Sequence, residues 1–435
     1  MSAPGSRRED PPDAATIEPE AAARRLRELV AEHETWRTSC LNLVAAENVM
    51  SPAARSLLDS DLVSRYGDYV GRDLAARKYF GTAVMVEIER LVDGLLRRLF
   101  DVPFVESRSL SGHVAGSAAL LALTNPGDVV LELDSPGGGH RIAEKLNATH
   151  HARLEVLPLP LDPDVYNVDV GRTLELARER RPRVIILGSS LFLFPHPLRE
   201  LAAGLVEQPE TLVVYDASHV LGLIAGHRFQ DPLAEGARLV WASTHKSFPG
   251  PPGGLVMSRS EEFVERVTPA IYPGLVTNHN PGRMPALGVA AAEMLAFGEA
   301  YADAIVANAR RLAAEIDARG IPVVARKHGY TASHTVMLRV GEFGSARVVG
   351  ERLEQAGIVT TATRLPTALG DAGIRLGLAE LTRRGAVPDE MPSIAGLIAD
   401  VVAERRTPDA VRARTRDMAA GYRHIGYAFD APPAA

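Results

Sequence analysis

Short runs of apolar residues recur between residues 110 and 260, and stretches with helical spacing separate several of them. The runs stand at Val129–Leu133, Leu154–Leu157, Val184–Leu187, Leu212–Tyr215 and Leu239–Trp241, and the helical stretches at 171–181 and 196–207. Near-continuous apolar strands that alternate with helices are typical of a mostly parallel sheet covered on both faces. The pattern therefore predicts an α/β fold for this part of the chain.

Amphipathic spacing predicts further elements on either side of this region. Helices are expected from about residue 20, over 83–99 and over 113–123. Beyond residue 296 the pattern predicts a helix at 300–319, a strand at 335–340, a helix at 345–356, a strand at 373–377 and two terminal helices. Residues 1–19 are rich in proline, alanine and charge, which predicts a disordered tail. We therefore expect a large domain with an N-terminal arm over 20–295 and a small α+β domain over 296–435.

Composition narrows the classes of function. Of the 435 residues, 46% are apolar and 23% charged, and the net charge of −6 disfavours a nucleic-acid or polybasic membrane role. A single cysteine, Cys40, excludes an internal disulfide. No stretch approaches the roughly 18 continuous apolar residues of a membrane span, and no apolar run near residue 1 is typical of a signal peptide. We expect a cytoplasmic protein.

Polar residues follow several of the predicted strands. Asp216 ends the run at 212–215, and Lys246 follows the run at 239–241. A glycine-rich turn ending in His140 follows the run at 129–133, and Ser111-Gly112 precedes the helix at 113–123. Ligands of such sheets bind beyond the carboxyl ends of the strands. An acid, an imidazole, an amine and a small polar helix start should therefore meet at one edge of the sheet.

Pyridoxal phosphate chemistry needs this combination of groups. A lysine (Lys246) holds the aldehyde as a Schiff base, and a carboxylate (Asp216) keeps the pyridine nitrogen protonated. Backbone N–H groups at a helix start (Ser111, Gly112) bind phosphate, and a flat side chain (His140) covers the ring. Each residue alone also fits a commoner role, namely solvated lysine, helix cap, flexible turn or surface histidine. The combination at successive strand ends favours the cofactor site.

The motifs resemble those of serine hydroxymethyltransferase, a fold-type-I pyridoxal-phosphate family, from about Leu43 to Gly385. The matching segments are VAAEN (44–48), SRYGDY (64–69), RKYFG (77–81), SGH (111–113), GGH (138–140), YDASHVLGLIAG (215–226), STHK (243–246), GPPGGL (250–255), GIRLG (373–377) and LTRRG (381–385). The resemblance implies a large domain with a seven-stranded-type sheet and a smaller C-terminal domain.

The resemblance also implies the role of each site residue. The catalytic set would be Lys246, His140, His219, Tyr66 and Asp68, and the cofactor-binding set Ser111, Gly112, His113, His140, Ser190, Asp216, His219, Ser243, His245, Lys246 and Gly274. The substrate-binding set would be Arg375, Tyr66, Phe80 and Thr363, with Arg375 on the amino-acid carboxylate. Tyr66 and Asp68 would reach the site of a neighbouring subunit, which implies a homodimer and leaves a tetramer open. We expect no metal site.

Several positions depart from the family pattern. Ala46, Asp68, Phe80, His113, Pro252 and Thr363 replace the family's serine, glutamate, tyrosine, serine, arginine and asparagine, respectively. Asp68, Phe80 and Thr363 stand where the family handles tetrahydrofolate. A second resemblance, at 295–313, 328–334 and 244–251, is to the threonine transaldolases of natural-product biosynthesis. Those enzymes cleave L-threonine to acetaldehyde and pass a glycyl carbanion to another aldehyde without folate.

Two enzyme functions and one non-enzyme function remain open. The favoured hypothesis is a folate-independent L-threonine transaldolase or aldolase of specialised biosynthesis, which uses an amino acid and an aldehyde. The alternative is a tetrahydrofolate-dependent hydroxymethyltransferase that acts on serine or an α-substituted serine. A cofactor-binding regulatory protein is disfavoured, because the core catalytic residues are all present and no basic face accompanies them.

Overall fold

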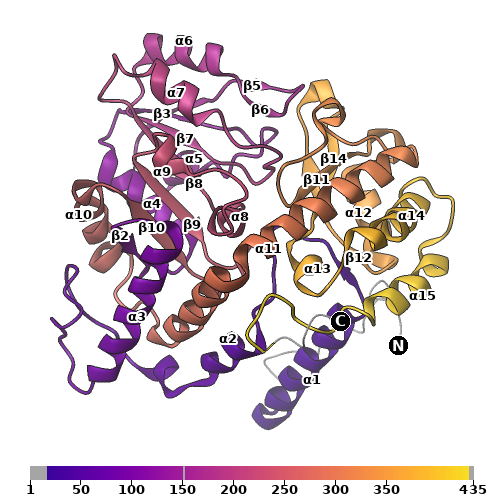
Figure 1. Ribbon diagram of the computed structural model, residues 1–435, viewed down its shortest axis with the longest axis horizontal. Coiled ribbons are helices and arrows are strands. Elements are labelled where there is room, and N and C mark those ends of the chain that lie inside the picture. The colour runs from indigo at the N-terminus through magenta and orange to yellow at the C-terminus, as the bar shows by residue number, and fades with distance from the viewer. Residues whose placement is uncertain (1–16, 150–151, 431–435) are drawn as a thin grey trace.

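A computed structural model describes residues 17–149 and 152–430. The tail predicted over 1–19 lies, up to residue 16, outside the described residues. The first helix, α1, spans Pro19–Thr38, close to the predicted start, and continues into a short strand, β1 (Leu41–Asn42), and helix α2 (Pro52–Ser56). In Figure 1, α1 projects from the lower edge of the molecule.

A seven-stranded sheet forms the centre of the larger part of the molecule (Figure 1). Its strands, in spatial order, are β2 (Phe104–Glu106), β10 (Gly254–Ser258), β9 (Leu239–Ser243), β8 (Leu212–Asp216), β7 (Val184–Leu187), β3 (Val129–Glu132) and β4 (Glu155–Pro158). The pairs from β9 to β4 are parallel, and β10 is antiparallel to both of its neighbours. The predicted α/β class is therefore confirmed, and all five predicted strands lie in this sheet.

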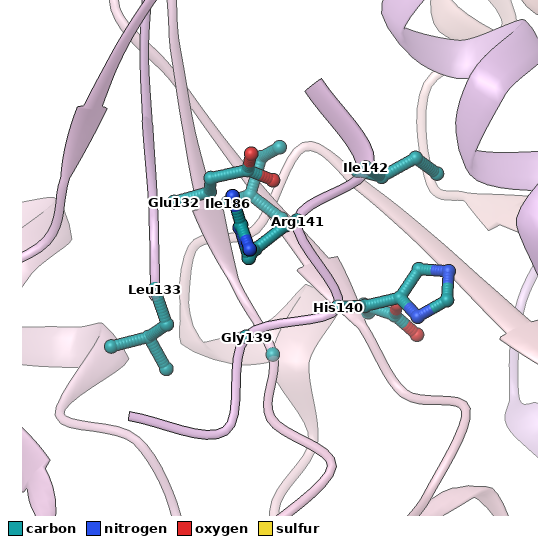
Figure 2. A pocket seen from close by; sticks show the side chains of 9 residues that line it. Glu132, Leu133, Gly139, His140, Arg141, Ile142 and Ile186 are labelled. Atoms are coloured by element: carbon teal, nitrogen blue, oxygen red, sulfur yellow. The ribbon is translucent and has the colours of Figure 1, made fainter. Parts of the chain in front are cut away.

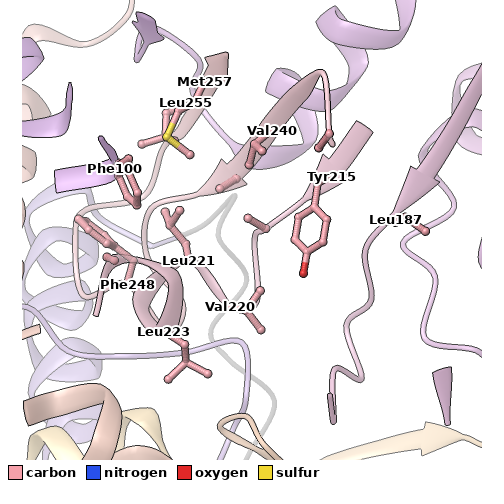
Figure 3. Close-up of a cluster of buried hydrophobic side chains, with 14 of the residues drawn as sticks. Phe100, Leu187, Tyr215, Val220, Leu221, Leu223, Val240, Phe248, Leu255 and Met257 are labelled. Carbon is pink, nitrogen blue, oxygen red and sulfur yellow. The ribbon is translucent and has the colours of Figure 1, made fainter. Parts of the chain in front are cut away.

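The two faces of the sheet pack against different helices. One face lies on α3 (Ala83–Phe100), α6 (Val170–Arg180), α7 (Leu198–Gly204), α8 (Leu221–Ala225) and the long α11 (Met284–Ala318). The other lies on α4 (Gly112–Leu123), α5 (Ile142–Ala148) and α10 (Glu261–Pro269). Alternate residues of a strand point to opposite faces, so Leu187 joins the first cluster and Ile186 the second. Figure 3 shows Leu187, Tyr215 and Val240 in the first cluster.

The C-terminal part has its own sheet and core. Antiparallel strands β11 (Thr335–Arg339), β14 (Ala372–Gly377) and β13 (Thr361–Arg364) pack with α12 (Ala346–Gln355), α14 (Met391–Val402) and α15 (Pro408–Ala419). The short β12 (Ile358–Val359) pairs with β1, which attaches the N-terminal arm to this part. The remaining short elements are β5 (Leu161–Asp162), β6 (Asn167–Val168), α9 (Pro232–Glu235) and α13 (Ala379–Arg383).

The long helix α11 joins the two parts. It starts at Met284, so the helix predicted at 300–319 is only its second half. Ile305 belongs to the core of the larger part and Ala309 to that of the smaller part. The predicted division between residues 295 and 296 falls inside this helix and stays a prediction. None of the helices in the described part of the chain combines the length and apolar character needed to cross a membrane.

Candidate active site

An amine and an imidazole meet beyond the ends of two central strands. Lys246 follows β9 and His219 follows β8, and Lys246 Nζ lies 3.2 Å from His219 Nε2. Burial lowers the pKa of Lys246, although the Asp216 carboxylate opposes this effect. Burial also lowers the pKa of His219 well below its usual range, and the charges of Lys246 and Arg375 add to the effect. The lowered pKa makes the Lys246 amine easier to deprotonate, and the neutral His219 imidazole lies beside it. Lys246 is therefore a good nucleophile.

Asp216 ends β8 but does not cap a helix. Its Oδ1 accepts the backbone N–H of Ser218 at 2.9 Å, and α8 begins only at Leu221. The commoner role, a helix N-cap, therefore does not apply. Gly188 at the end of β7 lies against the acid, because a Cβ at this position would stand 2.6 Å from Asp216 Cβ. A small cavity lies here, and His140, Gly188 and Asp216 are among the residues that line it (Figure 2).

The start of α4 packs tightly against the end of β9. Ser111 is the N-cap, and its Oγ accepts the backbone N–H of Val114 at 3.1 Å. A Cβ at Gly112 would lie 2.3 Å from Ser243 Oγ and 2.9 Å from Ser218 Oγ. Only glycine fits this approach without a shift. Because the first N–H groups of a helix have no partner within the helix, this end can bind an anion.

An arginine enters the site from the smaller part of the molecule. Arg375 lies on β14, and its Nη1 donates to the backbone carbonyl of Ser190 at 2.7 Å. The side chain is buried, and Nε has no partner among the described residues. Burial lowers the pKa of Arg375 to about 10, so the guanidinium stays charged at neutral pH. A buried cation with a free donor is suited to a carboxylate ligand.

Two histidines contact each other at the mouth of the site. His113 Nδ1 lies 3.0 Å from His140 Nε2, and the rings meet edge to face. Burial lowers the pKa of His140 to about 4, which keeps its imidazole neutral at neutral pH. His245 is partly buried, and its Nδ1 has no partner in the described part of the chain.

Five predicted site residues lie apart from this cluster. Tyr66 packs against Tyr79, Asp68 accepts a hydrogen bond from Tyr272, and the ring of Phe80 is fully exposed. Gly274 is exposed and lies in the π-helical segment Ala270–Leu275, and Thr363 lies on β13, opposite Gly373 of β14. Within residues 17–149 and 152–430, no hydrogen bond joins any of the five to Lys246 or Arg375. Their roles stay predictions.

Two polar residues of this region received no role in the sequence analysis. Ser218 stands between Asp216 and His219 and accepts the backbone N–H of Ser243 at 3.0 Å. His334 is fully buried and stacks on His219, with ring centroids 6.1 Å apart. Because Ser218 stands between Asp216 and His219 in the sequence, its position could have indicated that it lies in the site. His334 lies 115 residues from His219 in sequence, and only the fold brings the two rings together.

The side chains fit pyridoxal phosphate. Buried nitrogens without partners remain at His219 Nδ1 and Arg375 Nε, where a polar ligand can be bound. The first backbone N–H groups of α4, which starts at Gly112, have no partner within the helix and suit a phosphate. Lys246 would hold the aldehyde, Asp216 the ring nitrogen and His140 the ring face, and each of these groups has the required chemistry.

Comparison with known proteins gives one consistent family. Residues 20–398 match the family described as serine hydroxymethyltransferase. The chain is 42% identical over 405 residues to the serine hydroxymethyltransferase of Methanopyrus kandleri, covering 92% of this chain and 94% of that protein. It is 38% identical over 413 residues to the enzyme of the same name from Methanosphaera stadtmanae, covering 94% and 96%. A crystal structure of L-threonine transaldolase from Pseudomonas fluorescens in the internal aldimine state superposes with a TM-score of 0.87, at 29% identity over 94% of both chains.

Proposed function

The chain belongs to the serine hydroxymethyltransferase family and is a pyridoxal-phosphate-dependent enzyme, and we propose that it is a folate-independent L-threonine transaldolase or aldolase. Either enzyme breaks the Cα–Cβ bond of L-threonine and releases acetaldehyde. The transaldolase joins the remaining glycyl unit to a second aldehyde, whereas the aldolase protonates it to glycine. A cytoplasmic location and a place in specialised biosynthesis stay predictions that rest on the resemblance.

One contrast carries the proposal. The groups that would handle the amino acid and the cofactor are intact and largely buried, above all Lys246, His219 and Arg375. The positions that the resemblance assigns to folate are altered. Phe80 lacks a hydroxyl and Asp68 is one methylene shorter than glutamate. For the folate reaction, a displacement of about 1 Å at the group that transfers the proton can cost on the order of 100-fold in rate.

The residues of this chain divide the work of bond cleavage. When bound, pyridoxal phosphate withdraws the electron pair that the broken Cα–Cβ bond leaves behind. Asp216 holds the proton on the ring nitrogen, and Arg375 binds the α-carboxylate through its planar donors. His219 and Lys246 are close enough to exchange a proton, 3.2 Å apart. Breaking this bond also requires a base for the proton of the substrate's β-hydroxyl, and Asp68 of a partner subunit is our candidate.

The second candidate function is a genuine serine hydroxymethyltransferase. The names of the relatives that are 38–42% identical favour it. Purified enzyme loaded with the cofactor separates the two functions. We expect acetaldehyde release from L-threonine that an added second aldehyde accelerates, with a new β-hydroxy amino acid detected by mass spectrometry. Faster methylene transfer from L-serine to tetrahydrofolate than cleavage of L-threonine would instead establish the second function.

We infer that the enzyme works as a homodimer. An exposed apolar strip runs along residues 63–91 and includes Val70, Phe80, Val84 and Leu91, which are 66–102% exposed. Val84 and Leu91 lie two helical turns apart on the outer side of α3. Large apolar side chains that are exposed along one segment mark a surface that a partner can cover. Since Tyr66 lies in the same segment, a second copy on the strip would receive the residue that this chain does not bring to its own site.

A further inference from the structure

A lysine and two histidines, from three different elements, meet around the mouth of the site. His113 lies in the first turn of α4, His140 in the turn after β3, and Lys145 on α5. Lys145 Nζ lies 3.5 Å from His140 Nδ1, and His140 Nε2 lies 3.0 Å from His113 Nδ1. His140 therefore has a polar neighbour at each of its ring nitrogens.

The chemistry of the three groups sets the direction of these contacts. An ammonium group can only donate, so His140 Nδ1 must accept from Lys145. A neutral imidazole carries one proton, which must then lie on His140 Nε2 and be donated to His113 Nδ1. His113 in turn carries its own proton on Nε2. Other charged groups around His140 are Asp216, which favours protonation, and Lys246, which disfavours it.

The start of α5, the helix that carries Lys145, is held by other contacts. The Glu132 carboxylate at the end of β3 accepts the backbone N–H groups of Ala143 and Glu144 at 3.2 and 3.0 Å, which holds the start of α5. Arg141, between His140 and α5, has a φ of 57°, a left-handed conformation that is costly for arginine. Such a cost at one turn is typical of a position that function requires.

We propose that Lys145, His140 and His113 form a donor-to-acceptor chain that fixes the proton of His140 on Nε2 and holds the orientation of its ring. Lys145 and His113 are thereby positioning residues for His140. The inference rests on the proposed function only in that His140 covers the cofactor ring. The protonation state of His140 matters for the proposed reaction, because a neutral His140 ring adds no positive charge above the protonated pyridine ring of the cofactor. His113 replaces a serine of the family pattern, so the chain of contacts is a feature of this sequence.

Visible circular dichroism of the cofactor-loaded enzyme tests the proposal, because the signal depends on how the bound ring is oriented and needs no substrate. The variants are His113→Phe and Lys145→Met, which remove an acceptor and a donor, and their conservative controls His113→Asn and Lys145→Arg. Asparagine places Oδ1 near the position of Nδ1, and arginine can only donate. We expect the first two to change the sign or at least halve the amplitude of the visible band. His113→Asn and Lys145→Arg should keep most of the amplitude of this band.

The double variant His113→Phe/Lys145→Met decides whether the three groups act as one chain. We expect its change in the visible band to be no larger than that of the stronger single variant. Additive changes, or a His113→Asn variant that behaves like His113→Phe, would overturn the proposal. Because no substrate is present, these spectra are independent of whether L-threonine or L-serine is the donor.

Discussion

The chemistry of single residues depends on burial more than on residue type. Lys246 follows strand β9, and Lys327 lies in the short 3₁₀-helix Arg326–His328. Lys327 is exposed and pairs with Asp164, whereas Lys246 lies in the site, where burial lowers its pKa. The same desolvation keeps His140 neutral and leaves Arg375 charged, because an arginine starts from a much higher pKa.

Lys246→Ala should abolish the visible absorption band of the purified enzyme and its turnover of L-threonine. The reason is that the Lys246 side chain supplies the amine that would hold the aldehyde of the cofactor. Absorption spectra of the variant after incubation with pyridoxal phosphate provide the measurement. Lys327→Ala is the control and should behave as wild type. A Lys246→Ala enzyme with the wild-type band and activity would refute the assignment.

Arg375→Ala should raise KM for the amino acid by roughly 10–100-fold, with a smaller change in kcat, because a charged donor pair to the carboxylate is lost. Arg375→Lys keeps the charge but not the planar pair of donors, so its KM should lie between those of the wild type and Arg375→Ala. Steady-state kinetics with L-threonine and a fixed aldehyde measure both. An unchanged KM in Arg375→Ala would place the carboxylate elsewhere.

At the scale of elements, the site depends on how closely a helix start approaches a strand end. The near-continuous apolar runs of β7, β8 and β9 predict the strands, and Ser111 marks the start of α4. The pattern does not predict that α4 reaches the end of β9. Strands β2 and β10 were also missed, since β2 has only three residues and β10 directly follows the proline- and glycine-rich segment 249–253.

Gly112→Ala tests this contact. The new Cβ would stand 2.3 Å from Ser243 Oγ, so we expect a loss of about 1–3 kcal/mol in stability and weaker cofactor binding. Gly94→Ala on α3 is the matched control, because a Cβ there meets no atom within 4 Å. It should be neutral or stabilising by up to about 1 kcal/mol. Thermal unfolding measures the stability of both variants, and cofactor titration measures their affinity. Equal behaviour of the two variants would contradict the close approach of Gly112 to Ser243.

For the whole molecule, the described chain carries only part of the expected catalytic set. Tyr66 and Phe80 lie on the exposed apolar strip, and the half-buried Asp68 of the same segment is bonded to Tyr272 rather than to Lys246. A second subunit would supply them, and each of two symmetric sites would then combine residues of both chains. This arrangement makes a specific prediction about mixed dimers.

Co-expression of Lys246→Ala and Tyr66→Ala chains should restore activity that neither variant has alone. In a mixed dimer one site carries both changes and the other carries none, so the purified mixed dimer should approach about half of the wild-type activity, and the unfractionated mixture about one quarter. Differently tagged chains allow the mixed dimer to be purified and assayed. If Tyr66 serves the site of its own chain, every site is damaged and activity stays at the level of the single variants.

Buried histidines should make the fold sensitive to acid. Burial lowers the pKa of His196 to about 3, whereas an unfolded chain has the ordinary value near 6.5. Below pH 6.5 the unfolded state therefore binds a proton that the folded state does not. The free energy of unfolding falls by about 1.4 kcal/mol per pH unit for this residue, or roughly 2 kcal/mol at pH 5.

Urea unfolding at pH 7 and pH 5 measures this effect. His196→Gln removes the titrating group, so the loss of stability between the two pH values should be smaller than in wild type by about 2 kcal/mol. His33→Gln, at an exposed position of α1, is the control and should keep the wild-type pH dependence. An equal loss in His196→Gln and wild type would show that His196 titrates normally in the folded protein.

The sequence by itself determined the α/β class, five strands of the central sheet and the residues at the ends of β8 and β9. These features follow from local rules, since near-continuous apolar runs and the polar residues at their ends are properties of neighbouring residues. The tertiary structure decided what depends on distant residues. It brought Arg375 to Ser190, stacked His334 on His219, placed Lys145 beside His140 and ran α11 through both cores. Such contacts join residues far apart in the chain or depend on the packing of whole elements, and a local pattern carries no information about either.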